Sequence, residues 1–238
     1  MVVASRNASD MGGSQIYLEE GEKMSVEDLM KGISVSSGND AIVAMAEYIS
    51  GSENKFVELM NKKVKELGLK NTVFKNCTGL DEDGHYSSAY DMAQIAKELV
   101  KHEKILEFTG TYEDYINVSG ENHWLVNTNK LVRFYQGTTG LKTGTTGIAK
   151  YCLSATAERN GLELVAVVMA GETSDDRFSG AKKLLDYGFE NYELQSNQLD
   201  DFEVDDASRL NVLVTHANLN GDSKKYIKDY ELIANSTE

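Results

Sequence analysis

The spacing of apolar residues has a helical period over the first hundred residues of the chain. Between residues 53 and 67, apolar side chains recur every three or four positions, as they do on one face of an amphipathic helix. Residues 41–49 are apolar on nearly every side and predict a buried helix that begins just after Asn39. Serines that precede acidic or apolar runs supply the N-caps of further helices. The pattern predicts helices over residues 25–33, 41–49, 53–67 and 88–101.

After residue 110 the pattern changes to the alternation of apolar and polar residues that is typical of strands. The dipeptide Asn160-Gly161 separates two such runs and is a strong signal for a two-residue hairpin turn. Proline is absent from the sequence, so the turns must rest on Gly, Asn and Asp. Strands are predicted over residues 1–5, 15–19, 112–118, 141–144, 151–158 and 162–169, and a last helix over residues 177–192.

This order of elements predicts an α+β fold in which helices pack on an antiparallel sheet. Residues 1–194 are expected to form one domain. Residues 195–238 are polar and acidic and are expected to form a C-terminal appendage, either a remnant of a small β domain or partly disordered, with one strand over residues 210–215.

Composition and charge exclude several classes of function. The 238 residues carry a formal net charge of -14, which argues against nucleic-acid binding because phosphate contacts need clustered Lys and Arg. No run approaches the roughly 18 apolar residues of a membrane span, and the N-terminus does not resemble a signal peptide. The cysteines, Cys77 and Cys152, lack metal-ligand spacing and are expected to be free, buried thiols. We expect no metal and no cofactor.

Two short motifs carry candidate chemistry. Ser37-Gly38-Asn39 lies just before the buried helix, and Lys142-Thr143-Gly144 lies at the end of a strand that leads into the hairpin. Serine acyl-transfer enzymes that bind penicillin combine elements of these two types with a Ser-x-x-Lys nucleophile. Each motif alone is also compatible with a helix cap or a strand end, and their joint placement favours the functional interpretation.

Each residue of the two motifs suits a step of acyl transfer. The positive charge of Lys142 lowers the pKa of a neighbouring lysine base, and Ser37 can relay a proton to the leaving amine. Asn39 can hold the amide of the substrate. Gly144 lets an extended substrate approach the strand edge, where Thr143 can bind its terminal carboxylate.

Many further blocks of the sequence resemble the low-molecular-weight penicillin-binding proteins, above all the serine D-alanyl-D-alanine carboxypeptidases of Gram-positive bacteria. The resemblance covers roughly residues 1–192, with the blocks in family order. They include Ser36-Ser37-Gly38-Asn39-Asp40, Thr78-Gly79-Leu80-Asp81, Asn127-Thr128-Asn129-Lys130-Leu131 and Gly140-Leu141-Lys142-Thr143-Gly144.

The resemblance implies an enzyme at the extracellular face of the cell envelope. Such an enzyme removes the terminal D-alanine from peptidoglycan stem pentapeptides that end in D-Ala-D-Ala, and β-lactams acylate it. The resemblance further implies that Arg177 helps to hold the substrate carboxylate and that the backbone N–H of Thr145 completes the oxyanion hole.

The Ser-x-x-Lys nucleophile of the family is expected to be missing from this chain. In the family it precedes Ser-Gly-Asn by about 60 to 70 residues, whereas only 36 residues precede Ser37 here. Two other matches to the pattern begin at Ser52 and Ser179, and we interpret them as a helix cap and an ordinary residue of a helix. The chain alone is therefore expected to be inactive.

Two alternatives remain at this point. The chain can be a non-enzymatic protein that binds stem peptides through Lys142 and Arg177. It can also be a relative of class A β-lactamases, which need a Glu-x-x-x-Asn loop. Residues 113–117 match that loop formally but lie in a predicted strand and too far beyond Asn39, so this alternative is disfavoured.

Overall fold

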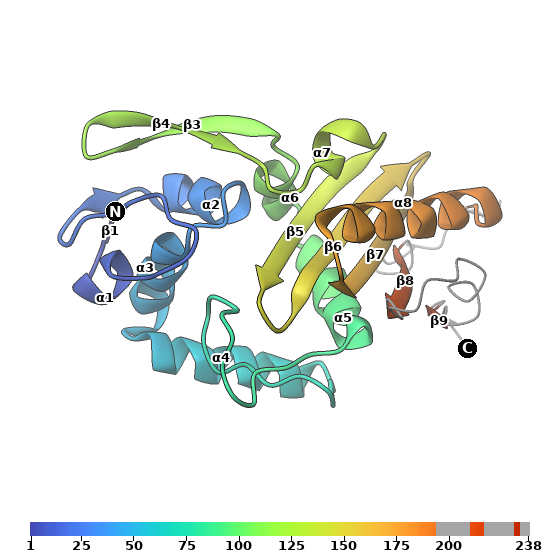
Figure 1. Cartoon of the computed structure of the whole chain (residues 1–238), viewed down its shortest axis with the longest axis horizontal. Coiled ribbons are helices and arrows are strands. Elements are labelled where there is room, and N and C mark those ends of the chain that lie inside the picture. The colour runs from blue at the N-terminus through green and yellow to red at the C-terminus, as the bar shows by residue number, and fades with distance from the viewer. Residues whose placement is uncertain (194–209, 217–230, 234–238) are drawn as a thin grey trace, which may run out of the picture. The chain divides into compact units, whose positions relative to one another are not determined.

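The computed structural model describes residues 1–193, 210–216 and 231–233 (Figure 1). The chain forms two compact units, each built from two stretches of sequence. Unit 1 comprises residues 1–88 and 107–130, and unit 2 comprises residues 89–106 and the chain from residue 131 onward. In the described part of the chain, no helix has the length and apolar character needed to cross a membrane.

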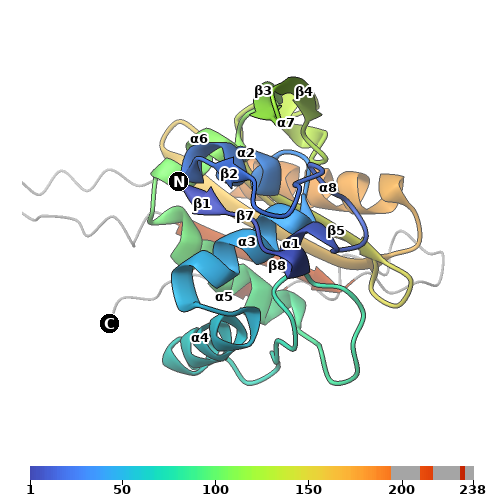
Figure 2. The same ribbon diagram turned by 90° about the vertical axis from the view of Figure 1, so that its left-hand side faces the viewer.

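Unit 1 is a layer of helices with two short antiparallel ribbons, β1–β2 and β3–β4. Its helix α2 contacts both α3 and β3, and α1 and β1 also contact α3 (Figure 2). The elements of unit 1 are β1 (Val2–Val3), α1 (Arg6–Ser9), β2 (Lys23–Met24), α2 (Val26–Ser34), α3 (Asn39–Ser50), α4 (Glu53–Glu66), β3 (Glu113–Val118) and β4 (Glu121–Val126). The short helix α6 (Lys104–Thr109) lies on the sequence boundary between the two units.

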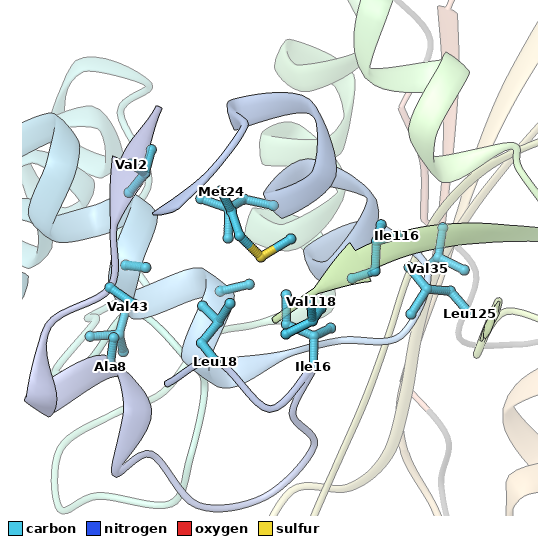
Figure 3. Close-up of a cluster of buried hydrophobic side chains, with 14 residues drawn as sticks. Val2, Ala8, Ile16, Leu18, Met24, Val35, Val43, Ile116, Val118 and Leu125 are labelled. Carbon is cyan, nitrogen blue, oxygen red and sulfur yellow. The ribbon is translucent and has the colours of Figure 1, made fainter. Parts of the chain in front are cut away.

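The core of unit 1 joins residues from the beginning of the chain to residues of the β3–β4 ribbon. Val2, Ile16 and Val43 pack together with Ile116 and Leu125, and all of them are buried (Figure 3). The inward residues of β3 alternate with exposed ones, as expected for a strand with one buried face. Residues more than a hundred positions apart thus share one core.

Unit 2 is built around a sheet with strand order β5-β6-β7-β8-β9. The strands β5, β6 and β7 pair antiparallel, β8 pairs parallel with β7, and β9 pairs antiparallel with β8. The elements are α5 (Ala89–Val100), α7 (Leu131–Phe134), β5 (Thr138–Thr146), β6 (Lys150–Arg159), β7 (Leu162–Gly171), α8 (Ser174–Asn191), β8 (Leu210–His216) and β9 (Glu231–Ile233).

Helices cover both faces of the unit 2 sheet. Along β7, Leu164 and Ala166 belong to one apolar cluster with residues of α8. The intervening Val165 and Val167 belong to another cluster with residues of α5. Successive side chains of a strand point to opposite faces, so α8 and α5 lie on opposite faces of β7. This explains why β7 reads as a continuous apolar run.

Most of the predicted elements are confirmed, and β3, β5, β6, β7 and β8 lie where strands were expected. Ser25 and Ser52 act as the N-caps of α2 and α4. The helix α8 begins three residues earlier than predicted, because Thr173 and Asp176 form a capping box. The short elements α1, β2, α6, α7, β4 and β9 were not predicted.

The strand predicted over residues 15–19 is wrong. This segment has no regular secondary structure. The backbone N–H groups of Ile16 and Leu18 donate to the carboxylate of Asp40 instead of to a neighbouring strand. The segment does alternate apolar and polar residues, but the carboxylate of Asp40 accepts the hydrogen bonds that a neighbouring strand would otherwise accept.

Candidate functional site

Ser37 and Asn39 lie at the beginning of α3 in unit 1. Ser37 has left-handed backbone dihedral angles, with φ of 65°. This conformation costs a non-glycine residue roughly 1–2 kcal/mol. Asn39 is the first residue of the helix and is buried; its Nδ2 donates to the carbonyl of Gly12 at 2.8 Å, and its backbone N–H donates to the carbonyl of Ser14 at 2.7 Å. The loop 12–14 therefore fixes the Asn39 side chain.

Close packing in this loop requires a glycine at position 13. A Cβ atom there would lie 2.6 Å from Nδ2 of Asn39, and the φ of Gly13 is +83°. A larger residue would therefore displace the Asn39 amide and strain its own backbone.

Asp40 also fixes the segment that follows this loop. It is fully buried, and its carboxylate accepts hydrogen bonds from the backbone N–H groups of Ile16, Leu18 and Ala41 at 2.9–3.1 Å. A buried carboxylate needs such donors to offset its lost hydration. No role for Asp40 was predicted from the sequence, although an acidic residue in the first turn of a buried helix is a recognisable signal.

The second motif lies on β5 in unit 2, which is an edge strand of its sheet. Lys142 and Thr143 pair in register with Ser154 and Leu153 of β6. Thr143 is buried, whereas Gly144 is exposed. An edge strand with an exposed glycine can accept an extended peptide as an additional strand.

Arg177 of α8 packs against the end of this motif. Its Nη1 donates to the carbonyl of Gly144 at 3.1 Å, to Oγ1 of Thr145 at 3.0 Å and to the carbonyl of Cys152 at 3.4 Å. The ring of Tyr151 lies 5.4 Å from the guanidinium carbon. Arg177 is only 8% exposed, and among its described surroundings its buried Nε has no hydrogen-bond partner.

The electrostatics of this group favour an anionic ligand. Burial, together with the positive charge of Arg177, lowers the pKa of Lys142 to about 8. Burial also lowers the pKa of Arg177 from its ordinary value, while Cys152 and Tyr151 act to raise it. The Lys142 ammonium donates to the carbonyl of Thr143 at 2.9 Å. Two cations that repel each other in a partly buried place can both be stabilised by a bound carboxylate.

The structure thus assembles the predicted residues in two groups. Unit 2 brings Arg177 together with the strand that carries Lys142, Thr143, Gly144 and Thr145. Unit 1 holds Ser37 and Asn39 at one helix start. Tyr151 and the carbonyl of Cys152 were not predicted as neighbours of Arg177, since both follow only from the pairing of β5 with β6.

The two other matches to Ser-x-x-Lys have structural roles. The Oγ of Ser52 accepts a hydrogen bond from the backbone N–H of Lys55, as an N-cap does. The Oγ of Ser179 donates to the carbonyl of Asp176 on the exposed side of α8. Both observations agree with the interpretation made from sequence.

Both cysteines are free, as predicted, but each is half-buried rather than buried. Cys77 contacts the carboxylate of Glu53, and burial together with that carboxylate raises the pKa of its thiol to about 12. Such a thiol is a poor nucleophile, because the thiolate is the reactive form.

A family model described as D-alanyl-D-alanine carboxypeptidase matches residues 1–173. The chain is 58% identical over 193 residues to D-alanyl-D-alanine carboxypeptidase DacF of Bacillus subtilis (strain 168). It is 40% identical over 199 residues to D-alanyl-D-alanine carboxypeptidase DacA of Escherichia coli (strain K12). These alignments cover 81% and 80% of this chain but 50% and 47% of the relatives. The chain therefore spans about half the length of the curated relatives it matches.

Solved structures show the same likeness. The D-alanyl-D-alanine carboxypeptidase DacD from Francisella tularensis is similar with a TM-score of 0.77 at 28% identity, over 92% of this chain and 60% of that one. A single-residue mutant of the Streptomyces K15 DD-transpeptidase is similar with a TM-score of 0.75 at 30% identity, over 79% of both chains.

The family model covers well over half of the chain, and the relatives align across four fifths of it. The confirmed arrangement of helices and antiparallel strands agrees with the solved neighbours. The chain therefore belongs to the serine D-alanyl-D-alanine carboxypeptidase family and has the α+β fold of penicillin-binding proteins.

Proposed function

We propose that this chain supplies the substrate-holding part of an enzyme that removes the terminal D-alanine from peptidoglycan stem pentapeptides. The observation that carries this proposal is the contact of Arg177 with Gly144 and Thr145, beside Lys142 on an edge strand. This arrangement offers two cations and a strand edge to a peptide that ends in a carboxylate. Membership of the family supports the same conclusion.

In the proposed reaction a lysine base takes the proton of a serine hydroxyl, and the serine Oγ attacks the carbonyl carbon of the penultimate D-alanine. The bond from that carbon to the nitrogen of the terminal D-alanine breaks, and the nitrogen takes up a proton that Ser37 relays. The backbone N–H of Thr145 stabilises the oxyanion, and Asn39 holds the substrate amide. Water then hydrolyses the acyl-enzyme and regenerates the serine. β-Lactams acylate the same serine in this proposal.

We place the attacking serine and its lysine base outside the 238 residues, because both Ser-x-x-Lys matches inside them have structural roles. The chain as given is therefore expected to bind without reacting. The enzyme is proposed to act at the extracellular face of the cell envelope, where its polymer substrate lies.

The proposal is tested first by acylation with a fluorescent penicillin. The 238-residue chain should remain unlabelled, whereas a protein extended upstream to include a Ser-x-x-Lys segment should be labelled at one serine. Failure of the extended protein to label would contradict the enzymatic proposal. Labelling of the chain as given would show that it contains its own nucleophile.

Binding is tested separately, by calorimetry with a diacetyl-Lys-D-Ala-D-Ala peptide. Arg177→Ala should abolish saturable binding, whereas Arg6→Ala, which removes an exposed arginine of α1, should leave it unchanged. Saturable binding by a protein that no penicillin labels, even when extended, would favour the alternative of a non-enzymatic stem-peptide-binding protein. The residues that hold the carboxylate serve that alternative equally well.

A further inference from the structure

The β3–β4 ribbon of unit 1 presents an exposed aromatic pair that the proposed reaction does not use. Tyr115 and Trp124 are directly opposite each other in the register of the two strands. Their side chains are 60% and 59% exposed. Large aromatic residues are usually among the more buried ones, so two that lie exposed and side by side indicate a contact surface.

The pair is the centre of a larger face, which we call the aromatic face. Alternate residues of a strand point to the same side, and residues in register lie side by side. The members of the aromatic face are all exposed and form three cross-strand pairs, Glu113 with Val126, Tyr115 with Trp124, and Asn117 with Asn122. The amide of Asn117 also donates to the side-chain oxygen of Asn122 at 3.3 Å.

The opposite face of the ribbon is firmly anchored. Ile116, Val118 and Leu125 point into the core of unit 1 (Figure 3). Nζ of Lys31 on α2 lies 2.9 Å from the carboxylate of Asp114. At the turn, the backbone N–H of Ser119 donates to the carboxylate of Glu22. The aromatic face is therefore presented on a fixed support, which lowers the entropy lost when a ligand binds.

The chemistry of the aromatic face fits a neutral sugar polymer. The negative faces of aromatic rings attract the weakly positive C–H groups on the flat side of a pyranose ring. The Asn117–Asn122 pair lies two residues further along the strands, which is about 7 Å and about the span of one sugar ring with its substituent. Amide groups at that distance can exchange hydrogen bonds with an acetamido group.

Charge argues against polyanions and anionic membranes as ligands of the aromatic face. The aromatic face bears one formal charge, on Glu113, and that charge is negative. The whole chain has a net charge of -14, so it repels polyanions and anionic membranes. We propose that the aromatic face binds a polymer of N-acetylated amino sugars. The choice of amino sugars rests on the proposed function, because stem peptides are attached to such glycan strands.

A single tryptophan makes this proposal directly testable. Trp124 is the only tryptophan in the sequence, so the intrinsic tryptophan fluorescence of the whole protein reports on the aromatic face. Titration with chitohexaose should shift or quench this emission saturably, whereas cellohexaose, which lacks acetamido groups, should bind at least about tenfold more weakly. No saturable change with chitohexaose, or an equal response to cellohexaose, would overturn the proposal.

The contribution of each side chain is measured with matched variants. Tyr115→Ala should weaken the binding of chitohexaose at least about tenfold, and Asn117→Ala should reduce the preference for chitohexaose over cellohexaose. Tyr48→Ala removes a tyrosine of α3 that is equally exposed, at 58%, and should change neither. Because these side chains are exposed, circular dichroism should show that all three variants fold. Equal weakening in Tyr48→Ala would contradict the assignment.

Two other occupants of the aromatic face are distinguished in the same samples. If the face joins two copies of this chain, sedimentation should show a dimer that Tyr115→Ala dissociates. If it contacts lipid, phosphatidylcholine vesicles should shift the tryptophan emission. Either result without binding of chitohexaose overturns the sugar proposal. The calorimetric test of Arg177 uses a peptide without sugar, so failure of the proposed function and failure of this proposal give different results.

Discussion

Asp40 shows at the scale of one residue how the Ser37–Asn39 corner is held. Its carboxylate satisfies three buried backbone N–H groups, two of which belong to a segment without regular secondary structure. A single side chain therefore replaces the hydrogen bonds that a neighbouring strand would supply. It also fixes the chain next to the loop that contacts Asn39.

Replacing Asp40 should consequently destabilise the protein strongly. Asp40→Ala leaves the N–H groups of Ile16, Leu18 and Ala41 buried without partners, and each costs roughly 1–3 kcal/mol. We expect the free energy of unfolding to fall by about 3–5 kcal/mol in urea denaturation. Asp83→Asn, at an exposed position, should change it by less than about 0.5 kcal/mol. A small effect of Asp40→Ala would show that water or a rearranged loop satisfies these groups.

Lys142 has a pKa of about 8, which gives the stability a characteristic dependence on pH. The unfolded chain keeps this proton up to the ordinary lysine pKa of 10.5, whereas the folded chain releases it near 8. Between these values the unfolded state binds more protons, so the free energy of unfolding rises with pH. The total gain from Lys142 should be up to roughly 3 kcal/mol.

The measurement compares wild type with Lys142→Met by urea denaturation at several pH values between about 7.5 and 10.5. Other groups titrate in this range in both proteins, so only the difference between the two curves reports on Lys142. Wild type should gain stability relative to the variant as the pH rises. Parallel curves would show that Lys142 has an ordinary pKa in the folded chain.

At the scale of elements, Gly137 determines how closely β5, the strand that carries Lys142, approaches β6. Gly137 immediately precedes β5, and its carbonyl accepts a hydrogen bond from the backbone N–H of Glu158 at 2.8 Å. Its φ is +83°, and a Cβ atom at this position would lie 2.3 Å from the carbonyl oxygen of Glu158. No side chain can be accommodated there unless β5 and β6 move apart.

Gly137→Ala should therefore lower the free energy of unfolding by roughly 2–4 kcal/mol, from the left-handed backbone and the clash together. Gly12→Ala is the matched control, because its Cβ would meet open space and its φ is not in the left-handed region. Thermal denaturation of both variants gives the comparison. Equal stability of the two would mean that the β5–β6 pair adjusts without cost.

The elements also show which parts of the structure are readable from sequence. The helices α2 and α4, which begin with serine caps, and the Asn160-Gly161 hairpin were predicted because their signals are local. β4 was missed, since its exposed Trp124 and buried Leu125 follow polar residues and give no clear alternation. The failure at residues 15–19 has a non-local cause, because Asp40 lies more than twenty residues away.

At the scale of the whole molecule, sequence motifs predicted the residues of the candidate site but not the residues that surround them. Lys142 and Arg177 were named from motif and resemblance, and the structure brings the β5 motif and Arg177 together. The division into two units was not predicted. Each unit combines two separate stretches of sequence, and residues such as Val2 and Ile116 meet only after the chain has folded. Periodicity within a short window does not contain that information.

The net charge of -14 acts on the whole molecule and leads to the last prediction. At low ionic strength, like charges repel one another over about 30 Å, whereas near 0.1 M salt the range falls to about 10 Å. Because the folded chain concentrates these charges more than the unfolded chain, added sodium chloride should raise the melting temperature at neutral pH. Near the isoelectric point of about 4.8 the net charge vanishes, so the same addition should have little effect there. Calorimetric melting at both pH values, with and without salt, makes the comparison. A salt effect of equal size at the two pH values would indicate preferential hydration rather than relief of charge repulsion.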